Sequence, residues 1–235
     1  LNGVALSALT NLNAIAGSSV SVCIGQDGGL LGLTLAKGNA KSITCIGAML
    51  GAISLANVQE DIAWVGKFNI SDTLELETLG FANGVLVSDQ TKVLLDQLND
   101  FRFVFLVKQR AIAGSYFNDS HNACVVSSDY AYIENNRVIN KAIRFLDVAL
   151  TPYLNSNIDL NSDGTISDLS IEVFTSACNV ELESMKRNNN ISDYSILINS
   201  AQNVLSTGLL TIGVVLIPKG VARNINVNIG FALKL

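Results

Sequence analysis

Residues 136–150 read Asn-Arg-Val-Ile-Asn-Lys-Ala-Ile-Arg-Phe-Leu-Asp-Val-Ala-Leu, a pattern typical of a long amphipathic helix. The polar run Ser127-Ser128-Asp129 predicts where this helix begins, and Pro152 predicts where it ends. Apolar residues recur at helical spacing, and they are Ile139, Ala142, Ile143, Leu146, Leu150 and Tyr153. This periodicity predicts one face packed against a neighbouring layer.

The chain after this helix alternates between a second helical pattern and extended patterns. The second helix is expected to stop at Asn188-Asn189-Asn190. Its apolar face is formed by Ile171, Phe174, Cys178, Leu182 and Met185. Strands are expected at residues 194–198, 209–217 and 224–235. Residues 116–235 are therefore expected to form an α+β domain.

The chain before the helix has a different pattern. Residues 19–24 read Ser-Val-Ser-Val-Cys-Ile, which is typical of a buried strand, and residues 101–107 read Phe-Arg-Phe-Val-Phe-Leu-Val, which predicts a second strand. Residues 42–57 form an apolar helical pattern between them. Strands that alternate with helices predict an α/β domain over residues 1–115.

The last twelve residues, 224–235, alternate strictly between apolar and other residues. The apolar positions are Ile225, Val227, Ile229, Phe231, Leu233 and Leu235. A period of two places them on one face of an extended strand. Such a strand either completes the chain's own sheet or is donated to the sheet of another molecule. The residues of this segment leave both possibilities open.

Composition excludes several functions. The net charge is −5, with 15 basic and 20 acidic residues, which argues against nucleic-acid binding. Mean hydropathy is +0.38 and only 15% of residues are charged, which suggests a surface that is either neutral and polar or partly covered by other molecules. No apolar stretch approaches the ~20 residues that span a membrane. We expect no membrane span, no cofactor and no nucleic-acid partner.

The four cysteines lie far apart, at positions 23, 45, 124 and 178, and form no Cys-x-x-Cys pair. Three of them occur within apolar runs, which is typical of buried free thiols in a reducing compartment. With one histidine and no paired ligands, no zinc site is expected.

The segment Asp159-Leu-Asn161-Ser-Asp163-Gly164-Thr-Ile166 matches the first part of an EF-hand calcium loop. The twelfth position is Ser170 instead of the bidentate Glu, and no helix is expected to lead into the loop. A tight turn explains the same residues. The alternative function is therefore a calcium-binding adhesion or surface module.

Catalysis is not expected. A Ser-His-Asp triad would have to use His121, which lies in the polar run Asn118-Asp-Ser-His-Asn122 and is expected in an exposed loop. No Gly-x-Ser-x-Gly motif accompanies it.

Three basic residues, Arg137, Lys141 and Arg144, recur at helical spacing opposite the apolar face of the long helix. A solvated helix face is the simplest interpretation. A contact with an acidic partner is the alternative.

Several motifs, in order, resemble contractile tail sheath proteins of bacteriophages. The first are Ala113-Gly-Ser-Tyr-Phe117, Ser128-Asp-Tyr130 and Asn136-Arg-Val-Ile-Asn-Lys-Ala142, which in that family lead into a long helix. Further motifs follow in the same order, namely Leu150-Thr-Pro-Tyr-Leu154, Asp163-Gly164, Ile191-Ser-Asp-Tyr194, Gln202-Asn-Val-Leu-Ser-Thr-Gly208 and Ile217-Pro-Lys-Gly-Val-Ala-Arg-Asn-Ile225. The resemblance is good from about residue 111 onward and weaker over residues 19–110. It rests on the order and spacing of the motifs.

The resemblance implies that the first half is part of the subtilisin-like α/β insertion of sheath proteins and that the second half is the C-terminal sheath domain. It implies a structural subunit without catalysis, which polymerises helically around a tail tube and contracts to drive it through a cell envelope. The implied partners are other copies of the chain, the tail tube protein, and the baseplate and tail terminator proteins. The implied location is the virion tail, assembled in the host cytoplasm.

In sheath proteins, arms are exchanged between subunits as added β-strands, which gives residues 224–235 the role of an intersubunit strand. The resemblance also gives Arg137, Lys141 and Arg144 a possible contact with the tube. The chain begins at Leu1 within apparently ordered sequence, so an N-terminal portion that includes the sheath arm is expected to be missing.

Overall fold

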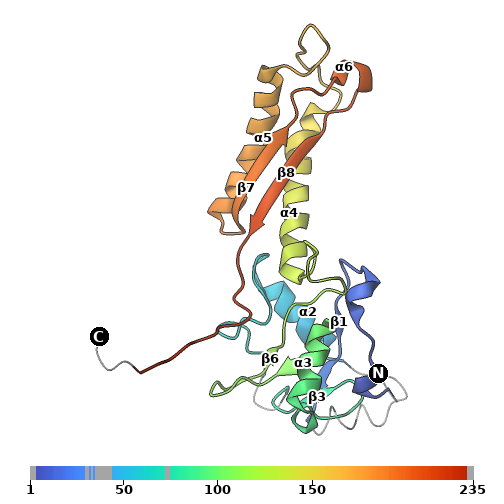
Figure 1. The fold of residues 1–235 in the computed structure, drawn as a ribbon, viewed down its shortest axis with the longest axis vertical. Helices are drawn as coiled ribbons and strands as arrows, with labels where there is room; N and C mark the ends of the chain where they lie inside the picture. Colours follow the sequence, from blue (N-terminus) through green and yellow to red (C-terminus); the bar gives the residue numbers. More distant parts are fainter. Residues whose placement is uncertain (1–3, 30–31, 33, 35–43, 72–74, 232–235) are drawn as a thin grey trace.

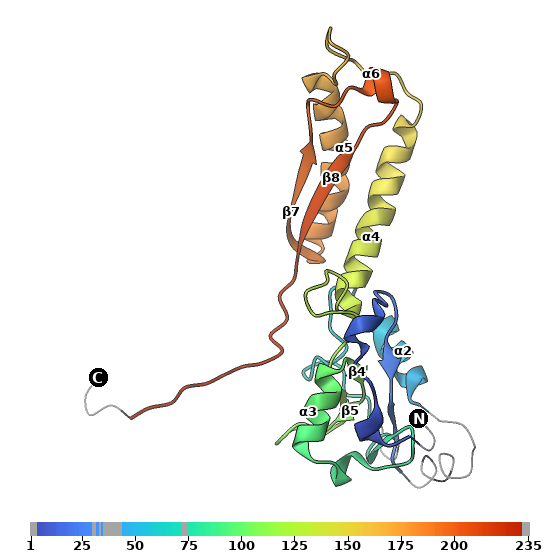
Figure 2. The same ribbon diagram turned by 45° about the vertical axis from the view of Figure 1, so that its right-hand side comes forward.

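The computed structural model describes residues 4–29, 32, 34, 44–71 and 75–231. These form a compact lower body and an elongated upper body, with a C-terminal arm that extends away from both (Figures 1 and 2). Within these residues, no helix is long and apolar enough to cross a membrane.

The lower body is built on a narrow sheet of short strands. Strands β1 (Val22–Cys23) and β2 (Gly25–Asp27) belong to one extended segment of the chain. Strands β4 (Phe103–Val104) and β5 (Leu106–Val107) belong to the neighbouring extended segment. β1 pairs with β4 in parallel, whereas β2–β3 and β5–β6 are antiparallel pairs. The outer strands are β3 (Leu79–Phe81) and β6 (Tyr116–Phe117). Ile24, between β1 and β2, bonds to the segments on both sides. Its N–H donates to the Val104 carbonyl, and its carbonyl accepts from the N–H of Ala82.

Both faces of this sheet are covered. Helix α2 (Ile46–Leu55) packs on one face through Met49 and Ala52, next to Cys23, Val104 and Leu106. Helix α3 (Lys92–Asp100) packs on the other face through Leu98, next to Ile24, Phe103 and Phe105. Residues 103–107 are all apolar because alternate side chains enter two cores.

The lower body thus combines short strands with helices, and its assignment as an α/β domain and a subtilisin-like insertion stays a prediction. Short 3₁₀ turns complete this body at Leu6–Ala8, Leu12–Ile15 and Val87–Asp89. Residues 116–131 also belong to it, because β6 pairs with β5 and Ala123 bridges to Gly17. The division into two domains after residue 115 stays a prediction.

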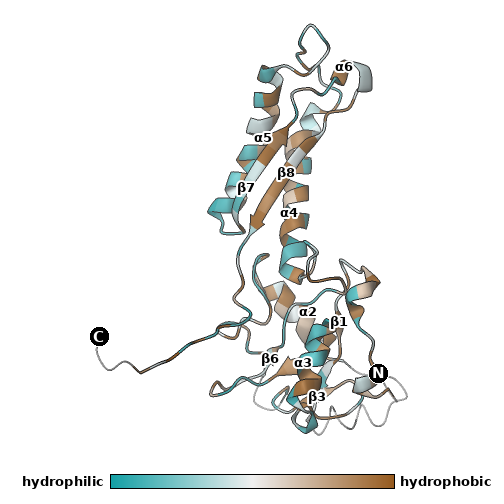
Figure 3. Cartoon of the chain, viewed as in Figure 1, coloured by the Kyte–Doolittle hydropathy of each residue, from teal (hydrophilic) through white to brown (hydrophobic). Residues whose placement is uncertain are grey.

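The upper body consists of two long helices and one hairpin. Helices α4 (Ile133–Leu150) and α5 (Asp168–Arg187) pack together, and the antiparallel strands β7 (Ile191–Ile198) and β8 (Ile212–Pro218) cover them. The short η4 (Thr151–Tyr153) and α6 (Val204–Thr207) lie at the far end. Figure 3 shows that β8 is apolar along most of its length. The buried residues common to this body are Val138, Ala142, Leu182, Met185 and Ile191.

The helix predictions hold with two differences. Helix α4 begins at Ile133 rather than near Ser127, because residues 118–131 first complete hydrogen bonds in the lower body. Ile143, expected on the packed face, is 55% exposed, and Val138 occupies the core instead. The predicted end of α5 at Asn188 is confirmed, as is the burial of Phe174, Cys178, Leu182 and Met185.

Residues 219–231 form no ladder with any strand in the described part of the chain. Ile225, Val227, Ile229 and Phe231 are 79%, 72%, 89% and 109% exposed. The first possibility for this segment, a strand that completes the chain's own sheet, is therefore not what residues 224–231 adopt. Leu233 and Leu235 lie outside the described residues.

Candidate functional site

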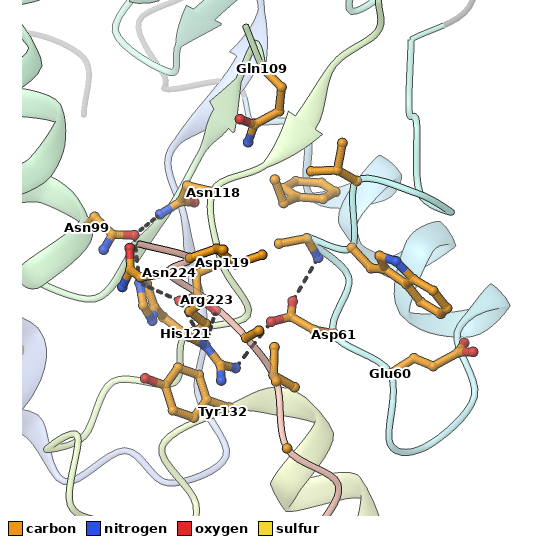
Figure 4. Close-up of a pocket in the computed structure, with 18 of the residues that line it drawn as sticks. Glu60, Asp61, Asn99, Gln109, Asn118, Asp119, His121, Tyr132, Arg223 and Asn224 are labelled. Atoms are coloured by element: carbon orange, nitrogen blue, oxygen red, sulfur yellow. Dashed lines mark hydrogen bonds and ion pairs between the residues drawn. The ribbon is translucent and has the colours of Figure 1, made fainter. Parts of the chain in front are cut away.

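The root of the arm crosses a groove in the lower body (Figure 4), and the arm then leaves the molecule (Figure 2). The groove has a volume of about 1170 Å³, and residues 220–225 form one of its walls. The other walls include the turns after α2, the end of α3, Gln109 and Ile112 after β5, and the polar segment after β6. Several segments distant in sequence therefore meet at the arm root.

Arg223 holds the arm root in this groove. Its Nε donates to both carboxylate oxygens of Asp119, at 2.9 and 3.1 Å. Its Nη2 donates to Asp61 Oδ2 at 3.2 Å and to Glu134 Oε1 at 2.5 Å. All three carboxylates are buried, while the Arg223 side chain is 24% exposed. A guanidinium with several donors suits this arrangement better than an ammonium.

Tyr132 lies between two guanidinium groups. The carbon of the Arg223 guanidinium is 3.5 Å from the centre of the Tyr132 ring, and that of Arg102 is 4.6 Å away. Arg102 is 2% exposed, and its Nε and Nη2 donate to the carbonyls of Asn122 and Ala131. The arm root is thus fixed by a stacking contact as well as by ion pairs.

The carboxylates are close enough to affect each other's ionisation. Burial, followed by the charges of Glu134 and Asp119, raises the pKa of Asp61 to about 7, and Arg223 opposes this rise. For Arg223 itself, burial acts against the charged form, but attraction to Asp119 and Glu134 prevails and raises its pKa. The site therefore retains its cation and holds one carboxyl that titrates near neutrality.

His121 is not in an exposed loop, which corrects the sequence-based prediction. The side chain is 3% exposed, and its Nε2 lies 3.0 Å from Asn99 Oδ1. The polar run that contains it folds inward because its amides and carboxylate bond to the lower sheet and to Arg223. Burial is the main reason why the pKa of His121 is lowered to about 4. Its imidazole is therefore neutral at physiological pH.

The basic helix face is partly used within the chain. Arg137 donates to the carbonyls of Ala56 and Asn57 at 2.9 and 3.1 Å, which satisfies acceptors at the end of α2. Lys141 Nζ donates to Asn190 Oδ1 at 2.7 Å. Arg144 is exposed. The structure places Arg137 in the contact between the upper and lower bodies, bonds Lys141 within the upper body and leaves Arg144 on the surface.

The segment with the calcium-loop pattern forms a tight turn. Asp163 Oδ1 accepts hydrogen bonds from the N–H and hydroxyl of Thr165, and Gly164 has a φ of +82°. Leu160 and Ile166 bridge across the turn. These local bonds explain the Asp, Asn and Gly residues as turn formers. Among the described residues, no group of three or more His, Cys, Asp and Glu side chains is placed to hold a metal ion.

The Arg223 cluster was not predicted from the sequence. Arg223 occurs within a motif quoted for the sheath resemblance, but its acidic partners lie up to 162 residues away. Glu134 lies in the first turn of α4, where acidic residues are common in surface helices, so its sequence position does not distinguish it. The local feature that could have pointed to this cluster is the concentration of polar residues at 118–122, directly after an apolar strand.

Residues 129–235 match a family model described as "DUF2586, C-terminal domain". No curated protein matches the sequence. Among solved structures, a chain of an extracellular contractile injection system, the PVC sheath complex in its contracted state, aligns with a TM-score of 0.55 and 12% identity. A chain of the anti-feeding prophage baseplate aligns with a TM-score of 0.59 and 14% identity.

The chain shares its fold with these contractile-system proteins. The alignments cover 80% and 96% of this chain, but only 50% and 59% of the two matched chains. The chain therefore spans between half and three-fifths of the length of these structures. The family model includes the upper body and the arm.

Proposed function

We propose that this chain is part of a structural subunit of a contractile tail sheath, which assembles helically around a tail tube and contracts to drive it through a cell envelope. The observation that carries the proposal is the arm, which is anchored at its root and, over the described residues 224–231, pairs with no strand and exposes its alternating apolar side chains. Its apolar side chains are exposed in the single chain, so burial requires another molecule. The fold shared with sheath and baseplate chains supports the same class of assembly.

The acceptor in this proposal is the hairpin of a second copy. In the described residues, β7 and β8 pair only with each other, so each has a free edge that can add a strand. Helix α4 lies against β8 and exposes a groove of about 330 Å³. That groove is lined by Ile143, Leu146, Asp147, Leu150, Thr151 and Leu154. An arm added beside β8 would bury its apolar face over this groove and leave its Asn residues in solvent.

Arg223 gives the arm a fixed exit from its own subunit. Because the ion pairs and the Tyr132 contact hold residue 223, motion of the arm begins beyond it. Such a tether keeps neighbours connected while other contacts change, as contraction between two lattices requires. Head-to-tail contacts of this kind produce helical polymers when they do not close into rings.

The remaining partners follow from this role. The tube protein would lie against the upper body, with Arg144 as the exposed cation of the basic face, and Arg137 and Lys141 already bonded within the chain. Baseplate and terminator proteins would bound the polymer at its ends. The particle would be a virion tail assembled in the host cytoplasm, and the subunit would have no catalytic role.

The experiment is negative-stain electron microscopy of the protein at high concentration, with and without residues 224–235. Tubes that form only with the arm are expected. Tubes that persist after truncation would remove strand donation, and discrete particles under both conditions would limit the resemblance to the fold. Circular dichroism of the truncated protein checks that the body still folds.

A further inference from the structure

Two thiols lie in contact within the lower body. The sulfurs of Cys23 and Cys45 are 3.7 Å apart, close to van der Waals contact. Cys23 is 8% exposed and belongs to β1, while Cys45 is half-buried and immediately precedes α2. Neither residue has a role in the arm or its anchor.

The backbone also holds the two residues together. The N–H of Cys45 donates to the Gly25 carbonyl at 2.8 Å, two residues after Cys23. Both cysteines pack in the core cluster that contains Met49 and Ala52. To form a disulfide, the two sulfurs must approach from this contact distance to about 2.05 Å.

The surroundings of Cys23 favour its thiolate. The hydrogen bond from the Cys45 thiol is the main reason why the pKa of Cys23 is lowered, burial opposes it, and the N–H of Gly25 adds a second donor. The same hydrogen bond, with burial and the Cys23 charge, raises the pKa of Cys45. The hydrogen bond between the two thiols therefore favours a thiolate at Cys23 over one at Cys45.

The other two cysteines have no such arrangement. The Cys124 thiol donates to the Tyr130 carbonyl at 3.5 Å, and Cys178 lies fully buried in α5, where burial raises its pKa. Reactivity is therefore expected at one pair.

We propose that Cys23 and Cys45 are a redox site that closes to a disulfide when the protein meets a peroxide. The Cys23 thiolate attacks one peroxide oxygen, which breaks the O–O bond and gives a sulfenic acid and hydroxide. The Cys45 sulfur then attacks the Cys23 sulfur, displaces its hydroxyl group and loses its proton. Two thiols and one hydrogen peroxide yield one disulfide and two waters. The half-buried Cys45 side provides access for the oxidant.

The bond would link β1 to the start of α2 and close the chain between residues 23 and 45. Such a crosslink restricts the unfolded chain and raises stability. This inference is independent of the proposed sheath function, because its readout needs neither polymer nor tube.

The test is peptide mapping of the protein after treatment with hydrogen peroxide and digestion by trypsin without reductant. The four cysteines fall in four different tryptic peptides, and residues 1–37 and 42–67 contain the two in question. A linked pair of these peptides is expected, with an intact mass about 2 Da lower and full reversal by dithiothreitol. A melting temperature roughly 5–10 °C higher is expected in the oxidised form.

Variants separate this pair from general oxidation. C178A should retain both the linked peptides and the temperature shift, whereas C23A and C45A should each lose them. Links that involve Cys124 or Cys178 instead, or oxygen addition to Cys23 without a crosslink, would overturn the proposal. The primary readout is the peptide map of the wild-type protein, so the test remains decisive even where a variant folds poorly.

Discussion

The guanidinium of Arg223 lies 3.5 Å from the ring centre of Tyr132, on a ring whose surroundings include a second arginine, Arg102, at 4.6 Å. Tyr132 immediately precedes α4, and Arg223 lies at the root of the arm. This contact therefore joins the start of the upper body to the point where the arm leaves the lower body. The contact fixes the arm at Arg223, and the arm extends away from the body beyond that residue.

Replacement of Arg223 by alanine should destabilise the protein by about 2–4 kcal/mol, because three buried carboxylates lose their shared cation. Urea unfolding of R223A and R223K measures this effect. R223K keeps the charge but loses the bidentate bonds and the stacking geometry, so an intermediate loss is expected. Equal stability of R223A and wild type would show that the cluster does not hold the arm root.

The pH dependence of stability should reveal two opposing groups. The pKa of Asp61 is raised to about 7 in the folded protein. Its contribution to the free energy of unfolding is therefore present at low pH and is lost as pH rises toward 7. The pKa of His121 is lowered to about 4, so its contribution is present above pH 6.5 and is lost as pH falls toward 4. Between about pH 4.5 and 6.5 the two slopes oppose each other.

Single variants should separate these slopes. D61N should become more stable as pH rises through that window, and H121N should become less stable, each by up to about 1.4 kcal/mol per pH unit. Urea titrations at several pH values measure both. D96N is the matched control, because Asp96 lies on the exposed surface of α3 in an i,i+4 pair with Lys92. Parallel profiles for D61N and wild type would contradict the assignment.

The two faces of the arm should differ in their effect on assembly. I229N and F231S should leave the melting temperature of the single subunit unchanged, because both side chains are exposed there. The same changes should abolish polymer, since they remove the apolar area that a second copy would bury. N226S and N228S alter the opposite face and should still polymerise. Sedimentation measures polymer formation. Polymer formed by I229N would contradict donation of this strand.

The basic face of α4 should separate into a structural and an exposed part. R137A should lower stability by about 1–2 kcal/mol, because the carbonyls of Ala56 and Asn57 lose their donor. R144E should leave stability unchanged and weaken co-sedimentation with tail tubes, more strongly at low salt than at high salt. Unchanged tube binding by R144E at low salt would show that this helix face is only exposed to solvent and does not contact the tube.

Calcium should not stabilise the protein. The turn around Asp163 is closed by hydrogen bonds to Thr165, so a titration of calcium should leave the melting temperature constant. T165A should loosen the turn without creating any calcium response. A melting temperature that rises with calcium concentration would restore the calcium-binding alternative.

Sequence periodicity determined those features that depend on neighbouring residues. The run at 101–107 predicted a strand, and β4 and β5 lie within it and enter two cores. Helix α5 buries the face predicted from Phe174, Cys178, Leu182 and Met185. The alternation at 224–235 indicated an extended segment, because side-chain direction in a strand follows sequence position alone.

Only the tertiary structure decided which distant residues meet. Asp61, Asp119 and Glu134 come from a turn, a polar segment and a helix start, and no local pattern joins them to Arg223. The same holds for His121, whose polar neighbours suggested solvent until the fold provided buried partners. A buried polar group is stable only where the chain path supplies its hydrogen bonds and counter-charges, and that path is fixed by the packing of the whole lower body.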